Sequence, residues 1–311
     1  MSDYSGYSKQ RSWRLAGGLL ILVVLAIGLF WLINGNNKQD VSKNGLQVVA
    51  AENFWGNIAG QIGGGHVHVT SIITDPTADP HLYESDARNA AAVSSANVVI
   101  VNGLGYDDFM GKLLGASKNN SRQVLTAAKI LNVTGDNANP HLWYDIPRVH
   151  EVAGSIAASF EAKDPAHKSD YERNLKAFDQ SLQPLLNTIS KIKAQYPGAP
   201  VAYTERVPGY LLTDAGLDVK TPSGFAQAIE DGNDPSPADT VAMDSLMTNK
   251  LARVLLYNAQ ATSPVTQHVQ DLAKQAGVPV VGVTETLPPN QHSYQSWQQD
   301  QLNKILTDLA R

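Results

Sequence analysis

Two short motifs of matching composition are candidates for metal chemistry. Positions 78–83 read Ala-Asp-Pro-His-Leu-Tyr and positions 138–143 read Ala-Asn-Pro-His-Leu-Trp, in a chain with eight histidines. Each proline fixes its own φ and holds the preceding residue extended, so the imidazole that follows is presented on a stiff loop. Rigid neutral imidazoles suit first-row divalent metals. A single loop histidine is more often structural, but the repeated context makes His81 and His141 candidate ligands.

Two glutamates follow predicted strands in the second half of the chain. Thr204-Glu205 comes after the apolar run 200–203, and Thr284-Glu285 comes after the apolar run 278–283. Loops beyond the carboxyl ends of parallel strands are where such sheets bind ligands. Each acid alone is typical of a solvated loop, and Glu205 beside Arg206 would fit a surface ion pair. Opposite the two histidines, however, the two acids favour a four-ligand cage.

The elements that must position these residues alternate between strand and helix. In the first half we predict strands at 47–51, 66–73 and 97–101, and helices at 54–62 and 85–95. In the second half we predict strands at 200–203, 254–257 and 278–283, and helices at 237–248, 265–275 and 294–309. This alternation predicts an α/β fold with two lobes, each a mostly parallel sheet flanked by helices.

One long helix is predicted between the lobes, over residues 164–197. Its apolar residues recur at steps of three and four from Tyr171 to Tyr196, which makes one continuous stripe. Asp164 suits the helix N-cap, and Pro184 is the one conflict, which predicts a bend. A dimerising coiled coil is the alternative. Because α/β segments flank the helix on both sides, we predict instead that the stripe packs on the lobes of a monomer.

The start of the chain carries a membrane signal. Residues 1–14 are polar and basic, and residues 15–33 contain no charge and are long enough to span a bilayer. A cleaved signal peptide is the alternative, but no small-x-small cleavage pattern follows, so we predict an uncleaved single-pass anchor. The basic residues ahead of it predict a cytoplasmic N-terminus and an extracytoplasmic globular part. A polar linker over 34–46 would lead to lobes at 47–163 and 198–311.

Composition excludes several classes of function. The 311 residues are 43% hydrophobic, which is enough for two domains, and the net charge of −5 without a basic aromatic patch argues against nucleic-acid binding. There is no cysteine, which excludes disulfides, thiolate metal sites, cysteine nucleophiles and a lipid on an N-terminal cysteine. No Gly-x-Ser-x-Gly motif and no phosphate-binding Gly-Lys-Ser/Thr loop occur.

From Gln47 to Arg311 the chain resembles the metal-binding solute-binding proteins of ABC importers, in the zinc/manganese family. The resemblance rests on the Asp-Pro-His and Asn-Pro-His-Leu-Trp motifs, on Val-Asn-Gly-Leu-Gly at 101–105, on the long helix, and on both Thr-Glu pairs, the second followed by Ser293-Tyr294. It implies two α/β lobes joined by one backbone helix, with a metal held between them. The four ligands would be His81, His141, Glu205 and Glu285.

The resemblance implies a carrier and not an enzyme. The chain would capture Mn²⁺ or Zn²⁺ outside the cell membrane and pass it to an ABC permease. Two glutamates lean towards manganese, and the lack of histidine in 117–138 weakens a zinc assignment. Because the lipid-acceptor cysteine of the family is absent, residues 15–33 would provide the anchor.

Two other functions stay open at this point. An exported metallohydrolase would need a water on the metal, and a binding protein for a metal chelate would need a large apolar or basic cleft. His292, close to Glu285 in sequence, is the alternative ligand.

Overall fold

The computed structural model describes residues 45–75, 86–135 and 137–311. The predicted anchor, residues 34–44 of the predicted linker and His81 therefore lie outside the described residues, and the last residue of the predicted linker, Leu46, already belongs to the first strand. Within the described part, no helix combines the length and apolar character that crossing a membrane requires. The described residues form one compact unit, which contains both lobes.

The N-terminal lobe is built on a four-stranded parallel sheet with the order β2-β1-β3-β4. Its elements are β1 (Leu46–Glu52), α2 (Asn53–Gly63), β2 (Val67–Ile73), α3 (Ala87–Ser95), β3 (Val98–Val101), α4 (Phe109–Ala116), β4 (Gln123–Thr126), α5 (Ala127–Ile130) and α6 (Val149–Lys163). Alternate residues face opposite sides: Val48 and Ile100 pack with α2 and α6, whereas Val49 and Val99 pack with α3 and α4. Burial on both faces explains the unbroken apolar runs of β1 and β3.

The C-terminal lobe repeats this plan, with parallel strands in the order β6-β5-β7-β8. Its elements are β5 (Pro200–Tyr203), α9 (Gly209–Asp214), β6 (Asp218–Val219), α10 (Ser223–Glu230), α11 (Pro237–Thr248), β7 (Leu255–Asn258), α12 (Pro264–Ala276), β8 (Val280–Val283) and α13 (Tyr294–Leu309). Leu256 and Val281 face α13 and α8, whereas Leu255 faces α10, α11 and α12. The predicted α/β fold with two sheet-based lobes is confirmed.

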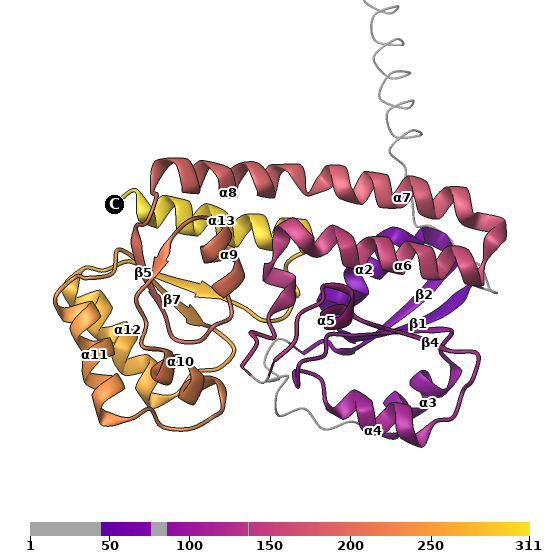
Figure 1. The fold of residues 1–311 in the computed structure, drawn as a ribbon, viewed down its shortest axis with the longest axis horizontal. Helices are drawn as coiled ribbons and strands as arrows, with labels where there is room; N and C mark the ends of the chain where they lie inside the picture. The colour runs from indigo at the N-terminus through magenta and orange to yellow at the C-terminus, as the bar shows by residue number, and fades with distance from the viewer. Residues whose placement is uncertain (1–44, 76–85, 136) are drawn as a thin grey trace, which may run out of the picture. The chain divides into compact units, whose positions relative to one another are not determined.

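The two lobes share the long helical connection, which consists of α7 (Lys168–Ser181) and α8 (Gln183–Gln195). In Figure 1, α7 runs over the N-terminal lobe and α8 continues over the C-terminal lobe beside α13. Six residues of the predicted stripe are buried against the lobes: Tyr171, Phe178, Leu182, Leu185, Ile189 and Ile192. The stripe therefore packs on the chain's own lobes, as we predicted.

The connection departs from one regular helix at two points. Leu182 separates α7 from α8, but its backbone dihedrals are still right-handed helical, so the chain continues in nearly the same helical path. The interruption places Pro184 in the first turn of α8. There the missing N–H of proline costs little. We predicted that Asp164 caps the helix, but its side chain makes no capping hydrogen bond. Its Oδ2 atom instead accepts a hydrogen bond from the Tyr171 hydroxyl at 2.8 Å and lies 2.7 Å from His167 Nδ1.

Candidate metal site between the lobes

Three of the four predicted ligands are described, and all three are buried. His141 lies before the short 3-10 helix Leu142–Tyr144 in the N-terminal lobe, Glu205 follows β5 and Glu285 follows β8. The exposed fractions of these three residues are 0%, 3% and 1%, respectively. His81, the fourth, lies in residues 76–85, outside the described residues.

The His141 imidazole is oriented by Asn139, two residues before it. Asn139 Nδ2 donates to the Arg206 carbonyl at 2.8 Å, which turns its Oδ1 towards His141. That oxygen accepts from the His141 backbone N–H at 3.1 Å and lies 2.7 Å from His141 Nδ1. The proton of the neutral ring therefore belongs on Nδ1, and the lone pair lies on Nε2, which is the arrangement a metal-binding histidine requires. His141 Nε2 is 3.6 Å from Glu285 Oε2.

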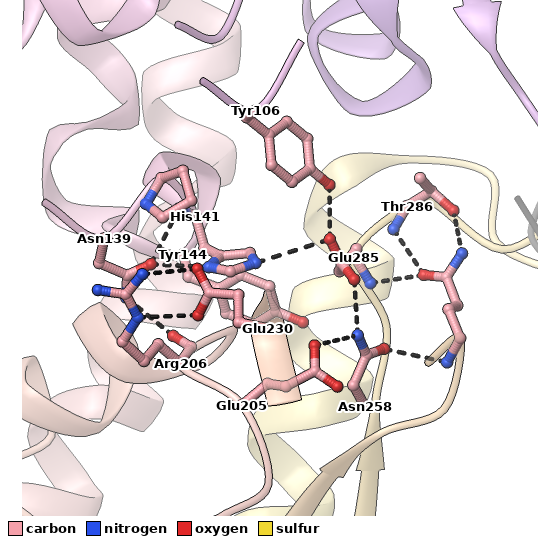
Figure 2. A network of polar contacts seen from close by, with 12 residues as sticks. Tyr106, Asn139, His141, Tyr144, Glu205, Arg206, Glu230, Asn258, Glu285 and Thr286 are labelled. Atoms are coloured by element: carbon pink, nitrogen blue, oxygen red, sulfur yellow. Dashed lines mark hydrogen bonds and ion pairs between the residues drawn. The ribbon is translucent and has the colours of Figure 1, made fainter. Parts of the chain in front are cut away.

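The two glutamates are joined by the side chain of Asn258, the last residue of β7. Its Nδ2 donates to Glu205 Oε2 at 2.9 Å and to Glu285 Oε1 at 2.6 Å. Figure 2 shows the amide between the two acids, with His141 approaching Glu285 from the other lobe. The acids meet here because β7 lies between β5 and β8 in the sheet. The expected convergence of side chains at the carboxyl ends of these strands is thus seen for Glu205 and Glu285.

Tyr106 brings a second contact from the N-terminal lobe, since its hydroxyl donates to Glu285 Oε2 at 2.8 Å. It follows a tight turn in which Gly103, Leu104 and Gly105 all have positive φ. The turn is held by Asp107, whose carboxylate accepts from Asn102 N at 2.6 Å and from Gly103 N at 2.9 Å. Burial raises the pKa of Asp107, and these two N–H donors partly offset that effect. The Val-Asn-Gly-Leu-Gly motif therefore positions a tyrosine at the site.

The surroundings of the site are aromatic and tied across the lobes. The Trp143 ring stacks on Phe54 at 4.0 Å between centroids and meets His141 edge-on at 5.3 Å. The Tyr294 hydroxyl donates to the Trp143 carbonyl at 2.6 Å, and the Tyr144 hydroxyl donates to the Thr284 carbonyl at 2.7 Å. Such a water-poor setting strengthens any electrostatic interaction with the acids.

The acid that pairs with Arg206 is Glu230, and this ion pair is largely buried. Arg206 forks onto Glu230, with nitrogen–oxygen distances of 2.8 and 2.7 Å. Within the described residues, no three histidine, cysteine, aspartate or glutamate side chains are grouped closely enough to hold a metal ion. Among the described residues, His141, Glu205 and Glu285 therefore form an incomplete ligand set. The fourth predicted ligand, His81, lies outside the described residues.

The remaining histidines lie elsewhere. His292, the alternative ligand, is exposed, and its backbone carbonyl accepts from Asn57 Nδ2 at 3.3 Å. His66 Nε2 is 2.8 Å from Asp170 Oδ2, and the His66 ring stacks on the His167 ring at 3.8 Å between centroids. His268 pairs with Asp244 at 3.2 Å on the surface of the C-terminal lobe.

Sequence reasoning missed Tyr106, Asn139 and Asn258. A signal for Asn258 was present, because it ends an apolar strand just as both glutamates follow one. Asn139 belongs to the second histidine motif, where it was noted only as the residue before proline. For Tyr106 the signal was weaker, since only the glycines before it indicated a turn.

Comparisons with known proteins agree with this architecture. The family model described as "Zinc-uptake complex component A periplasmic" matches residues 48–307. The manganese-binding lipoprotein MntA of Bacillus subtilis is 26% identical over 271 residues, covering 84% of this chain and 86% of that protein. The manganese ABC transporter substrate-binding lipoprotein PsaA of Streptococcus pneumoniae is 27% identical over 270 residues, covering 74% and 86%.

Two solved structures show the same fold. The periplasmic zinc binding protein TroA from Treponema pallidum superposes with a TM-score of 0.73 at 18% identity, covering 86% of this chain and 100% of that one. The solute-binding protein FpvC from Pseudomonas aeruginosa in complex with Mn²⁺ gives a TM-score of 0.72 at 21% identity, covering 86% and 98%.

Proposed function

Because the chain belongs to the family of the periplasmic component A of zinc-uptake complexes, we propose that it captures a divalent transition metal and delivers it to an ABC permease. The cargo is Mn²⁺ or Zn²⁺: the family model is described by zinc, whereas MntA and PsaA are named for manganese. Capture takes place on the extracytoplasmic side of the membrane, by a monomer that binds the ion between its two lobes.

We assign the cargo ligands to His81, His141, Glu205 and Glu285. The observation that carries this proposal is the buried meeting of His141 Nε2 with Glu285 Oε2 at 3.6 Å, across the lobes and beside Glu205. Two imidazoles and two carboxylates neutralise a divalent cation and provide both nitrogen and oxygen donors. Buried acids of this kind are stabilised when a cation binds between them.

The donor set also supports a transport role over catalysis. Members of this family bind and hand over a transported substrate. Four protein donors leave no open position for the reactive water that a metallohydrolase needs. A chelate-binding protein would need a cleft in place of the close His141–Glu285 contact.

We further propose that residues 15–33 keep the protein on the cell membrane. MntA and PsaA are named lipoproteins, whereas these 311 residues contain no cysteine to carry a lipid. The uncharged segment 15–33, which is long enough to span a bilayer, would anchor the protein in place of a lipid. Cell fractionation should place the protein with the membrane. Mature protein in the medium with an N-terminus beyond Ile33 would contradict the anchor and leave the metal site unaffected.

Metal titration of the purified chain tests the proposed cargo and ligands together. The wild-type protein should bind one equivalent of Mn²⁺ or Zn²⁺. His141→Ala should weaken binding by more than about 100-fold, because loss of a supporting residue alone costs about 10- to 100-fold. The matched control is His268→Ala, which removes an exposed histidine of the C-terminal lobe and should leave both affinities unchanged. Equal affinities for wild type and His141→Ala would remove His141 from the site.

A further inference from the structure

Residues 139–144, which we call the His141 segment, belong to the N-terminal lobe, but the C-terminal lobe binds their backbone at both ends. Near the start of the segment, the Tyr210 hydroxyl donates to the Asn139 carbonyl at 2.9 Å. Near its end, the Tyr294 hydroxyl donates to the Trp143 carbonyl at 2.6 Å. Tyr210 lies on α9 and Tyr294 begins α13, so two helices of the C-terminal lobe hold the segment.

Two side chains of the His141 segment reach the backbone beside the two glutamates. Asn139 Nδ2 donates at 2.8 Å to the carbonyl of Arg206, which directly follows the first glutamate (Figure 2). The Tyr144 hydroxyl donates at 2.7 Å to the carbonyl of Thr284, which directly precedes the second glutamate. Each bond joins the chain on one side of the histidine to backbone adjacent to one acid. Together they fix the spacing of the three described ligands.

The acceptor that Tyr144 uses is itself fixed on the C-terminal lobe. The Thr284 N–H donates to Gln301 Oε1 at 3.1 Å, and Thr284 Oγ1 accepts from the Trp297 indole at 2.9 Å. The Tyr144 ring is completely buried and meets Trp297 edge-on at 6.0 Å between centroids. The bond from Tyr144 therefore ties the His141 segment to a rigid part of the other lobe.

Tyrosine hydroxyls can hold this segment without disturbing the charge of the site. Burial raises the pKa of Tyr144, Tyr210 and Tyr294, so each hydroxyl keeps its proton and remains a donor. All three hydroxyls donate to backbone carbonyls. They therefore fix the histidine while adding no cation that would compete with the cargo.

We infer that Tyr144, Tyr210 and Tyr294 are positioning residues, whose hydroxyls hold His141 opposite the two glutamates before the metal ion arrives. The inference rests on the proposed function. Donors that are already in place bind an ion more tightly, because less conformational freedom is lost when the complex forms. This gain does not depend on which ion is bound, so manganese and zinc should benefit by similar factors.

Tyr144→Phe tests this role, because it removes the hydroxyl and keeps the ring. Mn²⁺ and Zn²⁺ dissociation constants are measured by competition titration of the full chain. Both should rise by about tenfold, the usual scale for losing a supporting partner. Co²⁺ in the site gives visible absorption that depends on the arrangement of its donors, so the Co²⁺ spectrum of the variant should also differ from that of the wild type.

Both changes are required. Dissociation constants within about threefold of the wild-type values would overturn the inference. Weaker binding with an unchanged Co²⁺ spectrum would also overturn it, because a tyrosine that only stabilises the fold would leave the donors of the bound ion in place.

The matched control is Tyr171→Phe. Tyr171 is also completely buried, and its hydroxyl donates to Asp164 Oδ2 at 2.8 Å, at the start of the helical connection. This variant should keep the dissociation constants and the Co²⁺ spectrum of the wild type. Equal effects in Tyr171→Phe and Tyr144→Phe would show that loss of any buried hydroxyl is enough, and would overturn the inference.

A measurement on the wild-type chain covers the case in which Tyr144→Phe does not fold. Two amides report on the His141 segment, since the Tyr144 N–H donates to the His141 carbonyl and the Asp145 N–H to the Leu142 carbonyl, both at 3.1 Å. Hydrogen exchange should show both amides protected in the metal-free protein. Protection that arises only after metal is added would overturn the inference. Failure of the wild-type chain to bind Mn²⁺, Zn²⁺ or Co²⁺ would instead overturn the proposed function.

Discussion

At the scale of the residue, the site combines two buried acids with neutral supports. Asn258 and Tyr106 hold Glu285 through hydrogen bonds of 2.6 and 2.8 Å, and Asn139 orients His141. Neutral supports matter because two buried carboxylates without a cation repel each other and lose hydration. The amide and the hydroxyl replace part of that hydration, and the negative charge remains for the cargo.

Glu285 should govern the choice of metal at this site. Glu285→His replaces an oxygen donor by a nitrogen donor, which zinc prefers and manganese does not. Manganese affinity should fall by about 10- to 100-fold while zinc affinity is kept or raised. Competition titration checks this, with the exposed Glu172→His as control. If Glu285→Ala leaves both affinities at the wild-type value, Glu285 is not a ligand and His292 is the next residue to test.

The repeated Pro-His motif was enough to find His141 as a candidate, and positions after apolar strands were enough to find Glu205 and Glu285. They were not enough to find Asn258, because an asparagine at a strand end has many uses and its partners come from strands far apart in sequence. The pairing of Arg206 with Glu230 was hidden for the same reason. Local patterns indicate which side chains reach the sheet edge, whereas their partners follow from the strand order.

At the scale of the element, helix α9 ends on an acid in an unfavourable position. Asp214 is partly buried, and its Oδ2 accepts no hydrogen bond from the residues that the structure describes. Burial first, and then the negative charge of Asp145, raise the pKa of Asp214 to about 6, against the opposite effect of Lys193. A carboxylate at a helix C-terminus also opposes the helix dipole.

Asp214→Asn should therefore stabilise the protein above pH 6. A raised folded-state pKa means that folding disfavours the ionised form of Asp214. The acid therefore lowers the free energy of unfolding at high pH, and it has no such effect at pH values below its unfolded-state pKa. At about 1.4 kcal/mol per pKa unit, the variant should gain about 1–3 kcal/mol in unfolding free energy at pH 8, with the gain shrinking towards pH 4. Denaturant unfolding at both pH values measures it, with the exposed Asp300→Asn as control. A gain independent of pH would contradict the cause given.

Element prediction succeeded where apolar periodicity was strong. The predicted ranges of β5, α11 and α13 match the structure at both ends. Helix α6 was not predicted, since it begins without a side-chain cap and contains small residues that blur its periodicity. Strand β4 is a short edge strand with a mixed burial pattern, and β6 has only two residues. Such elements are stabilised by their neighbours and have little pattern of their own.

At the scale of the whole described unit, the lobes are joined by more than the α7–α8 connection. Asn53 exchanges two hydrogen bonds with the Leu287 backbone, at 2.8 and 2.9 Å, and the Tyr210 hydroxyl donates to the Asn139 carbonyl at 2.9 Å. Rotation of one lobe against the other would break these contacts and bend the helix. Large hinge closure is typical of lobes joined by flexible crossovers instead.

Metal binding should therefore change the distance between the lobes only slightly. Small-angle scattering of the chain with and without Zn²⁺ should give closely similar radii of gyration, because the helical connection and the cross-lobe bonds hold the lobes in both states. A large decrease on metal addition would show hinge closure and contradict this description of the connection.

The most direct test of the metal site is anomalous diffraction from crystals of the manganese-loaded protein, recorded at energies that identify the ion. We predict one manganese peak between the lobes, bonded to the Nε2 atoms of His81 and His141 and to a carboxylate oxygen of both Glu205 and Glu285. A peak that contacts none of Glu205, Glu285 and His141, or one at the His66–His167 pair instead, would contradict the proposed site.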